Sequence, residues 1–318
     1  MLDSNPAVSD AALAAHARGA LAAFHAALAS PLGATLDAFT ARRGLDFDRA
    51  PLENFTRTAQ PVVHLPVWTA RALVASGVTL PRGALEGAVD AALFGYLCAQ
   101  VQDDGLEGRL GAPSGWALLA HAAFARHHAA LVAAAGPSPA FWTGYAERWL
   151  GYADAVATFA AKDGPVRGTE RVTATARSRP LVLPAAALLA GAGRAQWLEP
   201  LEQLVRGSTA AAQLYDDLLD AAEDLQHGRM TSVVREMGGE HGVDTLRRRL
   251  YLEGGFDSVL DQALTALASA RDAANDLGMS DAAAAFATDA ETMAGARRRY
   301  LDALEKHIFA DARGPAER

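Results

Sequence analysis

Long alanine-rich runs are the feature that most constrains how this chain can fold. The stretches AALAAHARGALAAFHAALA and DAAAAFATDAETMAGARRRYLDAL contain almost no helix breakers, and alanine has the highest helix propensity of the residues. No stretch shows the sustained alternation of Val, Ile, Thr or Tyr that is typical of strands. Because 51% of the 318 residues are hydrophobic, the chain can bury a large core. The sequence therefore predicts an all-α fold.

Glycine and proline divide the chain into segments of helical length. We expect helices over residues 8–29, 33–43, 60–76, 83–104, 115–134, 138–161, 170–190, 195–226, 242–252, 256–277 and 280–309. The segment 195–226 is long and almost free of breakers, which predicts a central helix. No Ser- or Gly-rich linker interrupts the chain, so we expect a single domain over residues 1–318, a bundle of about ten to twelve helices around a central active-site cavity.

Charge and cysteine content narrow the classes of partner and compartment. The formal net charge is −8 with a pI of about 5.6, and no basic stripe is present, which argues against a nucleic-acid partner. The single cysteine, Cys98, cannot form a disulfide within the chain and fits a reducing compartment. Neither a signal peptide nor a run long enough to cross a membrane is found. These features predict a cytoplasmic protein without a membrane span.

Two near-copies of one acidic motif are the main functional signal. Residues 99–107 read AQVQDDGLE and residues 212–220 read AQLYDDLLD. Each cluster places carboxylates four residues apart, on one helix face: Asp103 and Glu107 with Asp104 adjacent, and Asp216, Asp220 and Asp224 with Asp217 adjacent. Neither interleaves Lys or Arg at i+4, as a salt-bridged surface would. Mg²⁺ binds through carboxylates, water and substrate phosphates. The clusters therefore predict a magnesium and diphosphate site; the alternative is a solvated acidic face.

The motifs resemble those of the all-α class I isoprenoid enzymes, which comprise trans-isoprenyl diphosphate synthases and class I terpene synthases. The likeness covers residues 55 to 235, with a further match near residue 299. Residues 103–107 resemble the first Asp-rich motif of that superfamily, in the variant that ends in Glu, and residues 212–220 resemble the second. The spacing of Asp216, Asp220 and Asp224 also resembles the terpene-synthase metal triad. The resemblance implies the isoprenoid synthase fold and Mg²⁺ as cofactor, with about three ions around a bound diphosphate.

The resemblance also implies roles for basic and pocket residues. The positions that match diphosphate-binding or catalytic positions are Arg109, Arg177, Arg229, Arg299 and Tyr300. For Arg299 the alternative is the solvated basic end of a helix, which the residues alone favour. The expected substrate pocket comprises Phe94, Tyr96, Cys98, Ala99, Gln213 and Tyr215. Because Cys98 and Ala99 are small and lie one turn before the first motif, the resemblance implies a deep pocket for a C15–C20 or longer chain.

At some positions the chain differs from the family pattern, and these differences indicate which reaction to expect. Trans-isoprenyl diphosphate synthases hold isopentenyl diphosphate through a Gly-Gly-Lys stretch, a second Arg after the first motif and a His before it. Here the stretch is missing, and Leu110 and Tyr96 occupy the other two positions. We therefore expect a terpene synthase-like lyase acting on one allylic prenyl diphosphate. The alternatives are a prenyltransferase that uses isopentenyl diphosphate and a non-catalytic partner subunit. A homodimer is compatible with the resemblance.

We assign no metal-binding role to the adjacent histidines of the chain. His127 and His128 are adjacent and cannot share one helix face, so we expect exposed polar positions rather than metal ligands.

Overall fold

The described residues form a bundle of helices. A computed structural model describes residues 10–42, 64–106, 113–160 and 178–312, and in these it contains twelve α-helices, three short 3₁₀ helices and no strand. The first half comprises α1 (Asp10–Ala27), α2 (Ser30–Arg42), α4 (Leu65–Ala75), α5 (Arg82–Leu106), α6 (Pro113–Ala135) and α7 (Pro139–Ala160). The second half comprises η3 (Arg179–Val182), α9 (Leu183–Gly191), η4 (Ala195–Trp197), α10 (Leu198–Gln226), α11 (Ser232–Glu236), η5 (Gly239–His241), α12 (Val243–Tyr251), α13 (Gly255–Asp276) and α14 (Ser280–Ala312). The predicted all-α class is confirmed.

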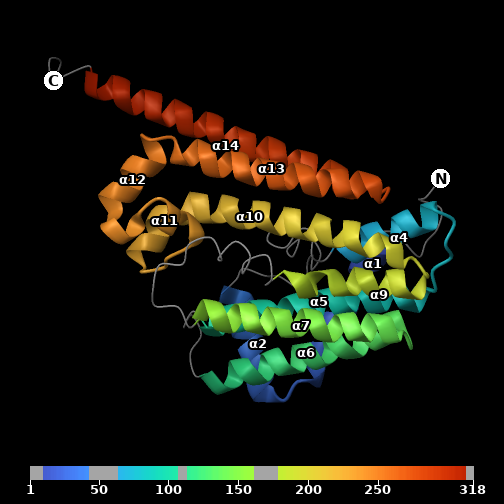
Figure 1. Cartoon of the computed structure of the whole chain (residues 1–318). Coiled ribbons are helices and arrows are strands. Elements are labelled where there is room, and N and C mark those ends of the chain that lie inside the picture. Colours follow the sequence, from blue (N-terminus) through green and yellow to red (C-terminus); the bar gives the residue numbers. More distant parts are fainter. Residues whose placement is uncertain (1–9, 43–63, 107–112, 161–177, 313–318) are drawn as a thin grey trace.

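The long helices fall into two groups (Figure 1). In one group α10, α13 and α14 follow one another in that order, and in the other α5, α6, α7 and α9 lie together. The most extensive contacts are those of α5 with α6 and of α10 with α13. Both η3 and α9 contact α5 as well as α10, so these two short elements connect the groups.

Glycine allows α5 to approach α6 closely. Gly87, Ala91 and Gly95 follow one another at steps of four, which places them on one face of α5. A Cβ atom at Gly87 would lie 3.0 Å from the Ala130 carbonyl oxygen, and one at Gly95 would lie 2.7 Å from His127 Nδ1. The backbones of the two helices are therefore nearer than larger side chains would permit.

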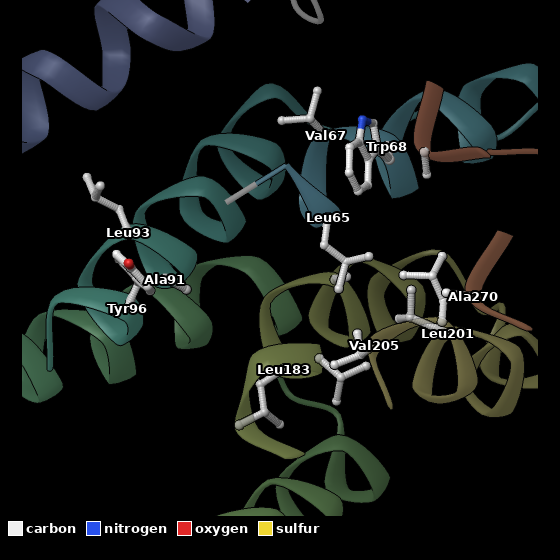
Figure 2. Packing of buried hydrophobic residues seen from close by; sticks show 14 of the residues in the cluster. Leu65, Val67, Trp68, Ala91, Leu93, Tyr96, Leu183, Leu201, Val205 and Ala270 are labelled. Carbon is white, nitrogen blue, oxygen red and sulfur yellow. The ribbon is translucent and has the colours of Figure 1, made fainter. Parts of the chain in front are cut away.

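A glycine also allows close approach in the second helix pair, α10 and α13. A Cβ atom at Gly207 of α10 would lie 2.6 Å from the Ala266 carbonyl oxygen of α13 and 3.1 Å from Ala270 Cβ. The hydrophobic core continues from this contact toward α4, where Leu65 points toward Leu201 and Val205 of α10 (Figure 2). Leu65 and Leu201 are completely buried. Burial of this apolar surface, at about 25 cal/mol per Å², is the main stabilising contribution.

The last long helix joins an early one. Arg71 of α4 forms an ion pair with Asp281 of α14, with an Nη1–Oδ2 distance of 2.7 Å. Nearby, the rings of Trp68 and Phe286 meet edge to face, with centroids 5.9 Å apart. Both aromatic side chains are buried, so α14 completes the core above α4.

Several helix boundaries differ from the predictions for local reasons. The helix predicted from residue 33 begins at Ser30, because Pro31 lies in the first turn, where a missing N–H costs nothing. The predicted helix 195–226 opens with the 3₁₀ turn η4 before α10. The described part of the predicted helix 170–190 is divided into η3 and α9, and each of these has proline in its first turn. The short helix α11 was not predicted.

None of the described helices combines the length and the apolar character that crossing a membrane requires.

Candidate metal and diphosphate site

The two acidic clusters lie at the same end of the bundle. Asp103 and Asp104 belong to the last turn of α5, and the second cluster occupies the C-terminal third of α10. Both helices run toward the end where α11 and α12 are found, on the left in Figure 1. The element η3, which begins two residues after Arg177, contacts both helices. The fold therefore directs both motifs to one region of the molecule.

In the first cluster the two aspartates differ in burial. Asp103 is partly exposed, whereas Asp104 has only 1% of its surface accessible. Gln102, the residue before Asp103, accepts a hydrogen bond at Oε1 from the hydroxyl of Tyr152. The distance is 3.1 Å, and the bond ties the end of α5 to α7. The predicted site residues Glu107, Arg109 and Arg177 lie outside the described residues.

The second cluster contains two exposed carboxylates, Asp216 and Asp220, on one stripe of α10. Partial burial and then the charges of Asp220 and Asp224 raise the pKa of Asp216. Partial burial and then the charges of Asp224 and Glu223 raise the pKa of Asp220, against a lowering by Arg229. The three stacked carboxylates repel one another, so a cation bound between them would be stabilised.

Asp217 is buried, and each of its carboxylate oxygens accepts a hydrogen bond. Its Oδ1 accepts a hydrogen bond from Gln213 Nε2 at 2.6 Å, and its Oδ2 accepts one from Ser232 Oγ at 3.0 Å. Burial raises the pKa of Asp217 to about 6, although these two hydrogen bonds act in the opposite direction. Because both carboxylate oxygens already have donors, Asp217 joins α10 to α11 rather than facing outward.

Asp224 is paired with an arginine from the segment that follows α10. Arg229 Nε lies 2.7 Å from Asp224 Oδ1, and the Arg229 backbone N–H donates to the Asp224 carbonyl, also at 2.7 Å. Gly228 has a φ of 71°, a left-handed conformation that glycine adopts without strain and that reverses the chain at this point. The turn thus delivers the predicted diphosphate-binding Arg229 to the acidic stripe, one third exposed.

The structure does not bring Arg299 and Tyr300 to the acidic helices. Both belong to α14, and α13 lies between α14 and α10 (Figure 1). The Tyr300 ring stacks on Phe256 at 4.3 Å, and its hydroxyl donates to the Tyr251 carbonyl at 2.6 Å. Arg299 is exposed. In this arrangement Tyr300 anchors α14 to the corner between α12 and α13.

The predicted pocket residues lie in different environments. Phe94 is completely buried against Phe24, with centroids 5.0 Å apart. Cys98 is also buried, which raises the pKa of its thiol to about 12. Tyr96 is buried, whereas Ala99 and Tyr215 are partly exposed. Gln213 is exposed and donates a hydrogen bond to Asp217. Phe94 and Cys98 therefore contribute to the helix core.

The sequence does not indicate the contacts that two residues, Ser232 and His127, make in the structure. Ser232 binds Asp217, and its only signal in the sequence is its position just after the Gly228 turn. His127 was expected to be exposed, and this expectation is wrong: its side chain is 2% exposed and reaches the Ala91 carbonyl. The space left by Gly95 on α5 admits the imidazole ring. His128 is exposed, as expected.

The fit of a metal ion can be judged from the donors that face solvent. Within the described ranges, no three His, Cys, Asp or Glu side chains gather closely enough to hold one ion. Mg²⁺ often binds through only one or two carboxylates and completes its shell with water and phosphate oxygens. Asp216 and Asp220 fit that mode, whereas Asp217 does not.

No protein-family model, curated protein or solved structure matches this chain.

Proposed function

We propose that the protein is a Mg²⁺-dependent enzyme of the class I terpene synthase type, which ionises an allylic prenyl diphosphate of C15–C20 or longer and releases diphosphate. The product would be a cyclic or linear terpene. The proposal rests on the two acidic motifs, on their resemblance to the isoprenoid enzymes, and on the arrangement of the described carboxylates.

The observation that carries the proposal is the pair Asp216 and Asp220. They lie one turn apart on α10, both reach solvent, and neither forms an ion pair within the described part of the chain. Their raised pKa values reflect partial burial first and then the charges of neighbouring carboxylates. An acidic surface selected for solubility would gain nothing from this repulsion, whereas a cation-binding surface requires it.

The surrounding residues support a diphosphate ligand. Bound Mg²⁺ would neutralise the diphosphate and make it a better leaving group. Arg229 lies beside the acidic stripe, paired through Nε with Asp224, and its positive charge would favour diphosphate oxygens bound nearby. Gln213 and Ser232 hold Asp217, so the helix turn that carries Asp216 is fixed against α11.

A lyase is favoured over a prenyltransferase because the isopentenyl diphosphate-binding groups implied by the resemblance are missing. The test is incubation with Mg²⁺ and C10, C15 or C20 allylic diphosphates, each with and without isopentenyl diphosphate. Extracted products would be analysed by gas chromatography, directly and after phosphatase treatment. We expect a hydrocarbon or alcohol without isopentenyl diphosphate. Longer diphosphates formed only in its presence would instead identify a prenyltransferase.

The control for this assay is a pair of double variants. Asp216→Ala with Asp220→Ala should abolish turnover and keep the helical circular dichroism, because alanine favours helix. The matched variant, Asp276→Ala with Asp302→Ala, changes two exposed carboxylates on α13 and α14 and should retain activity. Full activity in the first variant would refute the assignment of the metal site.

A further inference from the structure

A second polar site lies inside the bundle, between α6 and α7. His127 of α6 is 2% exposed, and its Nδ1 lies 2.7 Å from the carbonyl oxygen of Ala91 on α5. Because a carbonyl oxygen can only accept, Nδ1 carries the proton. In a neutral imidazole the other nitrogen is then an acceptor. Nε2 therefore presents a lone pair, and no described residue donates to it.

The complementary group comes from Trp149 of α7. Its indole Nε1–H is buried and finds no acceptor among the described residues. The rings of His127 and Trp149 are 5.7 Å apart, centroid to centroid, at an interplanar angle of 79°. Phe124 closes one side, 5.0 Å from the Trp149 ring. The buried acceptor and the buried donor thus belong to two rings in edge-to-face contact, with a third aromatic ring beside them.

We propose that His127 and Trp149 form a binding site for one small neutral hydroxylic molecule, a buried water. Such a molecule accepts a hydrogen bond from the indole N–H and donates one to Nε2. A buried polar group without a partner destabilises the folded protein, and buried waters typically satisfy groups of this kind. An anion would be repelled by the Nε2 lone pair.

The site has a connection to the first acidic cluster. The rings of Trp149 and Tyr152 meet edge to face at 5.4 Å, and the Tyr152 hydroxyl donates to Gln102, next to Asp103. A water bound at Trp149 would fix the ring against α6 and thereby support the end of α5. The proposal does not depend on the proposed enzymatic function.

The test is nuclear magnetic resonance of the protein labelled with ¹⁵N at tryptophan and histidine. The chain has five tryptophans, and Trp149→Phe assigns the relevant indole signal. We expect a nuclear Overhauser cross-peak between the Trp149 indole proton and water, with the sign of a long-lived bound molecule. Trp142 is the internal control, because its Nε1–H already donates to the Gly136 carbonyl at 3.2 Å.

Two results would overturn the proposal: absence of the water cross-peak, or a scalar coupling between Trp149 Nε1 and His127 Nε2, which marks a direct hydrogen bond. A supporting measurement uses His127→Leu, which removes the acceptor and should abolish the cross-peak at Trp149. If this variant fails to fold, the spectrum of the unchanged protein still decides.

Discussion

Individual buried side chains carry the strongest departures from ordinary chemistry in this protein. Burial lowers the pKa of His127 to about 4, from an ordinary value of 6.5. As the pH falls below 6.5, the His127 imidazole becomes protonated in the unfolded chain, whereas it stays neutral in the folded protein. The free energy of unfolding should therefore decrease between pH 6.5 and pH 4, by up to ~3 kcal/mol from this residue.

Urea unfolding across this pH range would measure the effect as the difference between the unchanged protein and His127→Asn. We expect the difference in the free energy of unfolding to shrink as the pH falls. The exposed neighbour provides the control, since His128→Asn removes a solvent-exposed imidazole and should change the free energy of unfolding much less. A constant difference for both variants would contradict a neutral, buried His127.

Asp217 shows the opposite linkage. Its pKa is raised to about 6, so its charged form destabilises the folded protein at neutral pH, and this cost disappears as the pH falls below 6. Asp217→Asn should therefore increase the free energy of unfolding at pH 7.5 by ~1–3 kcal/mol. Gln213 can turn its amide and Ser232 can rotate its hydroxyl to suit the new side chain.

The measurement is urea unfolding at pH 7.5 and at pH 4, where the gain should be lost. Asp220→Asn, at an exposed position, is the comparison and should change stability less. A loss of more than about 1 kcal/mol in Asp217→Asn would mean that its hydrogen bonds outweigh the cost of its charge.

At the scale of single residues, the sequence predicted which side chains form the acidic clusters but not what each one does. Helical spacing placed Asp216, Asp220 and Asp224 on one stripe, and the structure has them there. The distinction between exposed Asp216 and engaged Asp217 depends on Ser232, fifteen residues further along the chain. Contacts of this kind arise from tertiary folding and leave no periodic signal.

At the scale of helices, close packing at glycine is the feature most open to test. Gly207→Ala places a Cβ atom 2.6 Å from the Ala266 carbonyl oxygen, so α10 and α13 must move apart. We expect a loss of ~1–3 kcal/mol in the free energy of unfolding. Gly19→Ala, inside α1 with no atom within 4 Å, should instead stabilise the protein by about 1 kcal/mol.

Thermal or urea unfolding of both variants would provide the comparison. Equal stabilisation by the two substitutions would mean that α10 and α13 have room for a methyl group.

Most helices could be predicted because alanine-rich segments and glycine turns are local signals. The exceptions have local or tertiary causes. Five residues of α11 are too few for a recognisable period; Thr231 caps the helix by accepting from the Val234 N–H, and Ser232 attaches it to α10. The start of α2 differs from the prediction because proline is compatible with both a turn and the first turn of a helix, and the sequence near Pro31 does not distinguish the two.

At the scale of the whole molecule, the proposed ligands should stabilise the fold by mass action. Mg²⁺ and inorganic diphosphate together should raise the melting temperature by several degrees, since binding at 100 times the dissociation constant contributes about 2.7 kcal/mol. Differential scanning fluorimetry would measure this with each ligand alone and with both.

The double variant Asp216→Ala with Asp220→Ala should show no such rise. An equal rise in this variant would locate the binding elsewhere, and no rise in the unchanged protein would count against the proposed diphosphate site independently of any assay of turnover.

The contact between α4 and α14 has a consequence for the order of folding. The ion pair of Arg71 and Asp281 spans 210 residues, and Phe286 covers Trp68 across a similar separation. During synthesis from the N-terminus, the part of α4 that bears Trp68 and Arg71 therefore remains uncovered by α14 until residues 281–286 have left the ribosome. In the interval the side of Trp68 that meets Phe286 remains accessible to chaperones and to other nascent chains, so interrupted synthesis would leave an apolar surface exposed on α4.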